Sequence, residues 1–408
     1  MPKVDKLHGA RRGGVAHRQP TLTSPREKKT ANRREPETGD GAVGWGMALL
    51  FDPNAPAGAD AGLYGLPHGV EDAHVVVVPV PFEATVSYRA GTARGPAAIL
   101  AASHQVDLFD GDVGRPYQRG IAMLPVPDWL VGLNEEARAA AVTAIEAQIE
   151  GEAPHVDDVA RVDAAGARVN AWVDEQVTKL LHEKKLPVVV GGDHSVPFGA
   201  IAACARELGA KPLGVLHLDA HCDLREAYEG FRWSHASIMK NVLDGLPTTK
   251  LVQIGIRDFG DAELDVVRAH PERIATYFDV QLRRARLDGG FGALADRVVE
   301  NLPHDVYLSF DVDGLDPALC PSTGTPVPGG LSFDEVLTVL QALVGSGRRV
   351  VGLDLVEVAP PPDLDDEELG GCWDGNVGAR LLYKMIGAAL LSRGEGQPPD
   401  LPIPPGLR

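Results

Sequence analysis

Short apolar runs alternate with longer Ala-rich stretches from about residue 74 to about residue 391. The run Val75–Val78 consists of four β-branched residues, which is typical of a strand buried on both faces of a parallel sheet. Similar runs predict five further strands, at Pro187–Val190, Leu213–Leu218, Leu251–Gly255, Val306–Phe310 and Val350–Leu353. Helical patterns occupy residues 97–103, 134–150, 160–184, 197–208, 333–344 and 377–391. This repeated order of strand and helix predicts an α/β fold, with a central parallel sheet and helices on both of its faces.

The two ends of the chain differ from this central region. Residues 1–70 are rich in Gly, Pro and charge and show little periodicity, so we predict a disordered basic tail followed by an irregular N-terminal extension. Residues 71–396 are predicted to form one α/β domain, in which the segment 111–159 looks like an insertion between core elements. Residues 397–408 are rich in proline and are predicted to form an irregular C-terminal tail.

The charge of the chain is unevenly distributed. The 408 residues carry a net charge of −18, to which residues 1–36, with ten Lys/Arg and three acidic residues, contribute +7. The rest of the chain therefore carries −25, and such an acidic body argues against a nucleic-acid partner. We interpret the basic arm as a solvated tail, with a transit peptide or an arm that docks on an acidic neighbouring subunit as alternatives.

The apolar segments and the cysteines indicate where in the cell the protein is located. None of them reaches the roughly 20 residues that a membrane-spanning helix needs, so no membrane partner is expected. The N-terminal arm lacks the apolar core of a secretory signal. The cysteines form no C-x-x-C pair, which argues against a zinc ribbon or a redox motif; they are Cys204, Cys222, Cys320 and Cys372. We therefore expect free thiols and a cytoplasmic location.

Three of the predicted strands end in residue types that bind metal ions, and ligands of parallel sheets bind at this carboxyl edge. The motif GGDHS at 191–195 follows the first of these strands and brings His194 to the strand end. The motif DAHCD at 219–223 follows the second, and SFDVDGLDP at 309–317 includes the end of the third. Taken alone, the first motif is weak, because a histidine after two glycines often caps or packs instead.

Alternation along a strand gives the acidic residues a common face. Asp219, His221 and Asp223 are two residues apart, so their side chains point the same way, and Asp311 and Asp313 form a second set of this kind. These charges would repel each other or stay unpaired unless a cation lay among them. The alternatives are a hydrogen-bonded polar patch at 219–223 and, at 311–313, a turn in which the aspartates cap backbone N–H groups.

The combined set contains two histidines and four aspartates: His194, His221, Asp219, Asp223, Asp311 and Asp313. It is too acidic for one tetrahedral zinc ion, whereas oxygen-rich sites with some imidazole suit Mn²⁺. Two divalent cations would balance the four carboxylates. We therefore predict a two-metal hydrolase in which a bridging water ionises at neutral pH. His217 is interpreted as a residue that packs behind the ligands, and Cys222 as a core residue on the opposite face.

The three motifs resemble those of the ureohydrolases, the arginase and agmatinase superfamily, and the resemblance runs from about His74 to about Leu391. It implies the three-layer α/β/α arginase fold, a binuclear manganese site and a homohexamer or homotrimer. It also implies a ligand set for each metal. One ion would bind His194, Asp219, Asp223 and Asp311; the other would bind Asp219, His221, Asp311 and Asp313, so that Asp219 and Asp311 bridge.

The resemblance implies roles for three further residues. Thr325 and Glu357 would bind the substrate, since a carboxylate at 357 can accept two parallel N–H bonds from a planar guanidinium. His235 would act as a proton shuttle, with a packing or surface role as the alternative. The implied reaction is attack of a bridging hydroxide, oriented by Asp223 or Asp313, on the guanidino carbon, which gives urea and an amine.

The resemblance is closer to agmatinases than to arginases. Ala359 stands where arginases usually have Asn, and Tyr88-Arg89-Ala90-Gly91 is similar to the agmatinase branch. Agmatine or a related guanidino compound is therefore the expected small-molecule substrate.

Arg225 and Trp233 follow the second motif, and they leave more than one substrate tail possible. Arg225 would repel the ammonium group of agmatine and suit a carboxylate tail such as that of guanidinobutyrate, unless it pairs with Glu226 or Glu229. Trp233 could close the pocket down to free guanidine, as in the nickel-using guanidine hydrolases, which also tend to be long. The cofactors are accordingly expected to be two Mn²⁺ ions, with Ni²⁺ as the alternative.

Two remote alternatives belong to other classes of protein. A non-catalytic ureohydrolase homologue would typically have lost metal ligands, whereas all six are present here. A deacetylase-like relative of the same fold would use a single zinc ion and a different ligand set.

Overall fold

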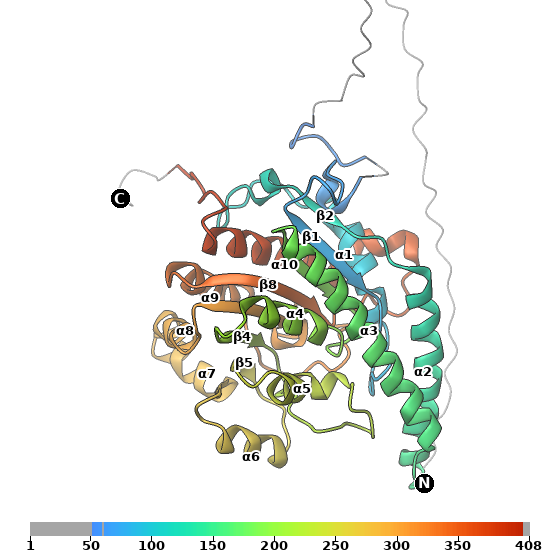
Figure 1. The fold of residues 1–408 in the computed structure, drawn as a ribbon. Helices are drawn as coiled ribbons and strands as arrows, with labels where there is room; N and C mark the ends of the chain where they lie inside the picture. Colours follow the sequence, from blue (N-terminus) through green and yellow to red (C-terminus); the bar gives the residue numbers. More distant parts are fainter. Residues whose placement is uncertain (1–50, 59–60, 403–408) are drawn as a thin grey trace, which may run out of the picture. The chain divides into compact units, whose positions relative to one another are not determined.

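The computed structural model describes residues 51–58 and 61–402, so the predictions for the basic tail at 1–50 and for residues 403–408 lie outside the described residues. A sheet of eight parallel strands forms the centre of the described chain, in the order β2-β1-β3-β8-β7-β4-β5-β6 (Figure 1). The strands are β1 (Val75–Val80), β2 (Ile121–Met123), β3 (Leu186–Gly191), β4 (Leu213–Leu218), β5 (Lys250–Ile256), β6 (Ile274–Phe278), β7 (Asp305–Asp311) and β8 (Arg349–Val356). All six predicted strands are present, and β2 and β6 are two edge strands that the sequence did not predict.

The apolar runs form strands because both faces of the sheet are covered. In β1, Val75 and Val77 contribute to one hydrophobic core, and Val76 and Val78 contribute to a second one on the opposite face. All four side chains are fully buried. A strand with this environment needs apolar residues at every position, which explains why the run shows no alternation of apolar and polar residues.

Helices complete the two cores (Figure 1). The first core is packed by α1 (Gly95–Ser103), α7 (Asp279–Leu287), α8 (Phe291–Glu300), α9 (Phe333–Gly345) and α10 (Trp373–Ser392). The second is packed by α2 (Asp128–Ile149), α3 (Val156–His182), α4 (Phe198–Leu208), α5 (Ile238–Gly245) and α6 (Asp261–Ala269). Short 3₁₀ turns lie at Leu63–Gly65, Thr92–Arg94, Pro116–Arg119, His235–Ser237, Val312–Gly314 and Asp366–Gly371. The prediction of a three-layer α/β/α fold is confirmed.

Two segments contribute more to the fold than their sequences indicate. The segment 111–159 supplies β2, which pairs in parallel with β1, and α2, which packs along α3. Residues 61–70, expected to be part of an irregular extension, contain the buried side chains of Leu63 and Tyr64. The Tyr64 hydroxyl donates to the carbonyl oxygen of Ala379 in α10 at 3.0 Å, so this segment is fixed to the first helix layer.

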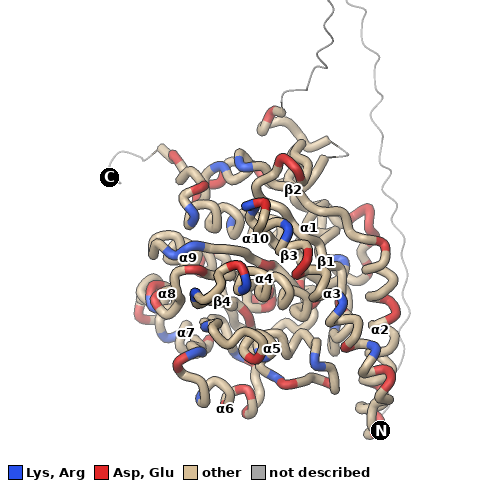
Figure 2. Tube along the Cα trace, viewed as in Figure 1, with Lys and Arg blue, Asp and Glu red and all other residues tan. Residues whose placement is uncertain are grey.

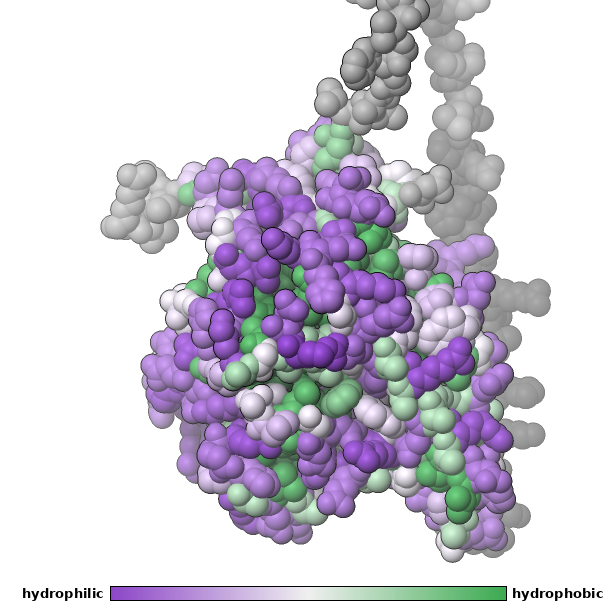
Figure 3. All heavy atoms as spheres, in the orientation of Figure 1, coloured by the Kyte–Doolittle hydropathy of each residue, from purple (hydrophilic) through white to green (hydrophobic). Residues whose placement is uncertain are grey.

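Most charged residues of the described chain lie outside the strands. The positions of acidic and basic residues are spread over the helices and connecting loops, and the strands carry few of them (Figure 2). The face seen in Figure 3 is mostly hydrophilic, with apolar residues in the furrows between elements. Within the described ranges, no helix combines the length and the apolar character that crossing a membrane requires.

Candidate metal centre and substrate pocket

The candidate site lies where four neighbouring strands end. β3, β8, β7 and β4 are adjacent in the sheet and run in the same direction. The residues that follow these strands therefore meet at one edge of the sheet. They include His194 after β3, Asp219 after β4, Asp311 at the end of β7 and Glu357 after β8.

His194 is buried, and its two ring nitrogens face different partners. Its Nδ1 lies close to three carboxylate oxygens: Asp219 Oδ2 at 3.0 Å, Asp223 Oδ2 at 3.2 Å and Asp311 Oδ2 at 3.4 Å. Its Nε2 lies 3.0 Å from Ser309 Oγ, and this hydroxyl donates to Asp354 Oδ1 at 3.1 Å. A ring held at one nitrogen and directed at carboxylates with the other has the arrangement of a metal-ligating histidine.

His221 forms the second group with two aspartates. Its Nδ1 lies 2.9 Å from Asp313 Oδ2 and 3.6 Å from Asp219 Oδ1. The Thr325 hydroxyl donates to the same oxygen of Asp313 at 3.2 Å. Asp219 thus belongs to both groups. Two sets of possible ligand atoms, each within 4.8 Å of one another, contain His194, His217, Asp219 and Asp223 in the first and Asp219, His221 and Asp313 in the second. The structure brings all six predicted ligands together, whereas the bridging role of Asp311 stays a prediction.

Three aspartates divide their two oxygens between the backbone and the cluster. The Oδ1 atoms of Asp311 and Asp313 accept backbone N–H groups, from Asp313 at 2.8 Å and from Ala220 at 3.0 Å. Asp219 Oδ1 likewise accepts the N–H of His221. The Oδ2 atoms are left to face the histidines. In each carboxylate one oxygen therefore caps a backbone N–H group, as in the turn-capping alternative, and the other is placed where it could bind a metal ion. The backbone bonds orient the second oxygen.

His217 and Gln253 support Asp219 from inside the sheet. His217 Nε2 lies 2.7 Å from Asp219 Oδ2, and its Nδ1 lies 3.0 Å from Gln253 Nε2. Because the Gln253 amide nitrogen is a donor, Nδ1 accepts, and Nε2 carries the proton that is donated to Asp219. Cys222 lies in the second core, which confirms its predicted position. His217 is buried beside Asp219 but also belongs to one set of possible ligand atoms, so its packing role stays a prediction.

The clustered carboxylates destabilise one another in the ionised form. Burial and the neighbouring charges of Asp313 and Asp219 raise the pKa of Asp311 well above its usual range. Burial and the charge of Asp219 raise the pKa of Asp223 to about 7. A divalent cation among these oxygens would relieve both effects. Carboxylate oxygens with a minority of imidazole nitrogens are a donor set that fits two such ions.

Asp223 and Glu357 hold a strained backbone. Their φ angles of 55° and 63° lie in the left-handed region, which residues other than glycine rarely adopt. The carbonyl of Asp223 accepts the N–H groups of Met239 and Lys240 in the first turn of α5, each at 3.1 Å. Glu357 Oε1 accepts the N–H of His194 at 2.9 Å. Strain that is held in place by such bonds is typical of functional sites.

A pocket of about 290 Å³ opens beside the His221 group. Its inner wall includes His221, Asp223, Thr325 and His235; its outer wall includes four residues that we call the rim: Tyr88, Arg225, Tyr228 and Asp258. Burial, together with the nearby His221 and His194, lowers the pKa of His235 to about 3, so this ring is neutral. Glu357 is buried and does not line the pocket, so its predicted contact with the guanidinium stays a prediction.

Residues 73–386 match the model of the arginase family. The chain belongs to the arginase family. It is 35% identical over 327 residues to N(1)-aminopropylagmatine ureohydrolase from Thermus thermophilus, covering 79% of this chain and 93% of that protein. It is 30% identical over 303 residues to agmatinase from Bacillus cereus, covering 73% and 87%. The crystal structure of proclavaminate amidino hydrolase from Streptomyces clavuligerus matches with a TM-score of 0.59 and 28% identity, over 82% of this chain and 99% of that one. The resemblance to the ureohydrolases is confirmed.

In this arginase-family chain Arg225 lines the pocket, but its charge is shared. Its Nε lies 3.6 Å from Glu263 Oε2, and its guanidinium lies over the Tyr228 ring, 4.9 Å from the centroid. Among the described residues, the acidic partner of Arg225 is therefore Glu263 in α6, and neither Glu226 nor Glu229 takes this role. The full positive charge expected from the sequence is offset at this position.

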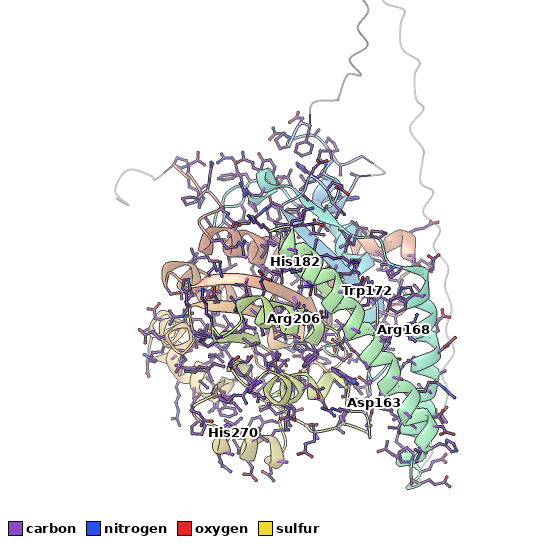
Figure 4. The ribbon with its side chains drawn as sticks, viewed as in Figure 1. Asp163, Arg168, Trp172, His182, Arg206 and His270 are labelled. Carbon is purple, nitrogen blue, oxygen red and sulfur yellow. The ribbon has the colours of Figure 1, made fainter. Side chains whose placement is uncertain are left out.

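The structure does not bring Trp233 into the pocket, which corrects its predicted role as a lid. Its ring packs on Phe198 with the centroids 5.0 Å apart, and its Cβ lies against Gly166 of α3. The reason lies in Asp163 of α3, which is labelled in Figure 4. Asp163 Oδ1 accepts the backbone N–H groups of Arg232 at 2.9 Å and Trp233 at 3.1 Å, and this turns the segment toward α3.

Several residues around the family site were missed by the sequence reasoning. Asp354 lies among the buried apolar residues of β8 and supports His194 through Ser309, and an acidic residue within a buried strand is a signal that could have found it. Thr85 contacts His235 across 150 positions of sequence, and no local motif indicates that contact. Glu263 reaches the pocket only because α6 packs beside the second motif.

Proposed function

We propose that this chain hydrolyses a guanidino C–N bond of agmatine or an N-substituted agmatine and releases urea and an amine. The observation that carries the proposal is the buried cluster of two imidazoles and four carboxylates at the floor of a pocket. The relatives support it, because their names describe ureohydrolases of agmatine and of N(1)-aminopropylagmatine.

The predicted metal ligands, Thr325 and His235 have different chemical roles. His194, Asp219, His221, Asp223, Asp311 and Asp313 would hold two divalent cations, which acidify a water molecule at neutral pH. The Thr325 hydroxyl, bound to Asp313, lies on the pocket wall within reach of a substrate. His235 lines the same pocket, where an imidazole can take a proton and pass it to the leaving amine.

The charge at the rim supports a substrate with a cationic tail. The positive charge of Arg225 is offset by Glu263, whereas Asp258 keeps a side chain that is 69% exposed. Arg225, Glu263 and Asp258 together therefore carry a net charge of −1 at the pocket, which attracts an ammonium group more than a carboxylate. An extended diamine tail satisfies this condition, and a guanidino acid does not.

We further propose manganese as the metal. Four carboxylates and two imidazoles form a hard, oxygen-rich donor set, which suits Mn²⁺ better than the softer sites preferred by other first-row ions. Nickel is the alternative that the test includes.

The test is a urea-release assay on one substrate panel with two metals. The panel consists of agmatine, N(1)-aminopropylagmatine, guanidinobutyrate, arginine and free guanidine, each assayed with manganese-loaded and with nickel-loaded protein. We expect the highest kcat/KM for a substrate with a cationic tail and manganese.

The other outcomes contradict parts of the proposal. Preference for guanidinobutyrate would show that Arg225 binds the carboxylate tail of the substrate although it is paired with Glu263. Turnover of free guanidine alone, best with nickel, would contradict the extended pocket. Metal-loaded protein that releases no urea from any compound would refute the proposed function.

A further inference from the structure

Thr85 lies between the pocket histidine and a buried acid. The residue is 1% exposed, and its Oγ1 lies 3.1 Å from His235 Nδ1 and 3.3 Å from Asp193 Oδ2. The backbone N–H of His235 also points at the same hydroxyl, with the nitrogen at 3.2 Å. One hydroxyl therefore connects His235 to a fully buried carboxylate.

The hydrogen bonds of Asp193 show that both of its oxygens are acceptors. Oδ1 accepts the backbone N–H and the hydroxyl of Ser195, with the backbone bond at 3.0 Å. Oδ2 accepts the backbone N–H of Thr85 at 3.4 Å. The Thr85 hydroxyl donates to the same Oδ2 at 3.3 Å, because an ionised carboxylate can only accept.

The single hydrogen of the Thr85 hydroxyl is thereby assigned. It goes to the charged carboxylate, which is a stronger acceptor than a neutral imidazole nitrogen. Oγ1 can then only accept from the His235 ring, so Nδ1 must carry the ring hydrogen. In a neutral imidazole the other nitrogen, Nε2, is then left with its lone pair.

We propose that Thr85, held by Asp193, is a positioning residue that fixes His235 as the Nδ1–H tautomer, with the lone pair of Nε2 directed to the pocket. Nδ1 is occupied by Thr85, and His235 lines the pocket, so Nε2 is the nitrogen that remains for a proton transfer there.

The loop that carries Thr85 is built to hold this position. Arg138 of α2 donates from Nη1 to the carbonyl oxygens of Ala84, at 3.2 Å, and of Val86. Both neighbours of Thr85 are thus fixed by one guanidinium. The hydroxyl is then presented to His235 at little further entropic cost.

The tautomer matters for the reaction, and this step of the argument rests on the proposed function. Hydrolysis adds one water to the guanidinium: the water oxygen goes to urea, and both water hydrogens end on the leaving amine, which departs as an ammonium ion. A neutral His235 with a free Nε2 can take one of these protons when the water attacks and return it to the amine nitrogen when the C–N bond breaks. A ring protonated at Nε2 could not make the first transfer.

The first arm of the experiment observes the tautomer directly. A neutron structure of deuterium-exchanged, manganese-loaded protein would locate the ring deuteron of His235. We expect it on Nδ1, within hydrogen-bonding distance of Thr85 Oγ1. A deuteron on Nε2 alone would overturn the proposal, whatever the protein hydrolyses.

The second arm is kinetic and uses the best substrate of the panel. Thr85→Val keeps the shape and removes the hydroxyl, so kcat should fall by about 10- to 100-fold, with KM and bound metal close to wild type. Thr85→Ser retains the hydroxyl and should restore most of kcat. The matched control is Thr92→Val, because Thr92 is equally buried but donates to Glu83.

The outcomes separate the two proposals. A Thr85→Val variant as active as wild type, or a Thr85→Ser variant as slow as Thr85→Val, would contradict the positioning role. If Thr85→Val failed to fold or lost its metal, the neutron structure of the wild-type protein would still decide. A wild-type protein that cleaves no guanidino compound would refute the proposed function and leave the tautomer to be judged by the neutron result alone.

Discussion

The floor of the pocket and its rim differ in how their side chains are held. By the floor we mean the six predicted metal ligands, His194, Asp219, His221, Asp223, Asp311 and Asp313. Five of these are at most 4% exposed, and their carboxylates are aimed by backbone N–H groups or by neighbouring buried side chains. The rim, by contrast, lies on loops, and Tyr88 there is 70% exposed.

Because of this difference, we expect the floor to determine whether the reaction occurs and the rim to determine which substrate is preferred. The floor is positioned by strand ends and turns, so a change there alters the charge balance of the whole cluster. At the rim, Arg225 is held by a long ion pair and by contact with one aromatic ring, so a change there alters only the field that a substrate tail meets. We therefore expect substitutions at the floor to abolish the reaction and substitutions at the rim to redirect it.

The largest effect is expected for Asp313→Asn. The substitution removes one negative charge from the floor while keeping an oxygen that can accept the N–H of Ala220. Turnover should fall by at least about 10³-fold and the bound metal should decrease, because one ligand to a divalent cation becomes neutral. Urea release and metal content by elemental analysis measure this. Asp316→Asn, an exposed neighbour, should behave as wild type, and near-normal activity of Asp313→Asn would refute the two-metal assignment.

A smaller effect is expected for Ser309→Ala. This residue touches no substrate, but it holds Nε2 of His194 and passes the contact on to Asp354. Its removal should weaken metal binding by about 10- to 100-fold, as is usual for groups that orient a metal ligand. A competition titration with a chelator measures the affinity. Ser346→Ala, at the end of α9, is the control, and equal affinities in the two variants would show that His194 needs no support.

Arg225→Ala tests the rim. Removal of the guanidinium leaves Glu263 and Asp258 unopposed, so the ratio of kcat/KM for agmatine to that for guanidinobutyrate should rise by about 3- to 10-fold, which corresponds to a partly screened charge. Arg268→Ala provides a matched loss of charge on the exposed surface of α6, where it pairs with Asp265. An unchanged ratio would mean that Arg225 does not select between substrate tails.

Trp233→Leu should have the smallest effect on the reaction. The ring packs on Phe198 and α3 rather than on the pocket, so the order of substrates should stay the same and kcat should change by less than about twofold. The melting temperature should fall by a few degrees because aromatic contact is lost. The substrate panel and a thermal melt measure both quantities. A gain of activity on larger substrates would support the hypothesis that Trp233 closes the pocket.

The sequence predicted the elements whose environment is uniform. Val75–Val78 was recognisable because every position is buried, and the same holds for the apolar runs in β3, β4 and β7. β6 (Ile274–Phe278) was missed because it is a half-buried edge strand with mixed side chains, and β2 because it has only three residues. Edge strands lack the signal that makes central strands visible.

The candidate site was predictable where its parts are local in sequence. The ligands at 219–223 and 311–313 were recognisable from their local motifs, and the structure brings them together. The expected alternation along a strand is not the reason, because β4 ends at Leu218 and Asp313 lies in the 3₁₀ turn Val312–Gly314. The placement of Trp233 was not predictable, because it depends on a distant carboxylate, Asp163, that turns the loop. Thr85 was missed for the same reason, since its partner His235 lies far away in the chain. The metal identity, the oligomer size and the cytoplasmic location stay predictions.

The position of β8 in the sheet has a consequence for biosynthesis. This strand is the last of the eight in the chain, yet it lies between β3, which leads to His194, and β7, which ends in Asp311. A nascent chain that has not yet delivered residues 349–356 has no continuous sheet to hold these two ligands side by side, although domains begin to fold from the N-terminus during synthesis. A divalent cation that needs His194 and Asp311 together could therefore bind only after residues 349–356 have been synthesised.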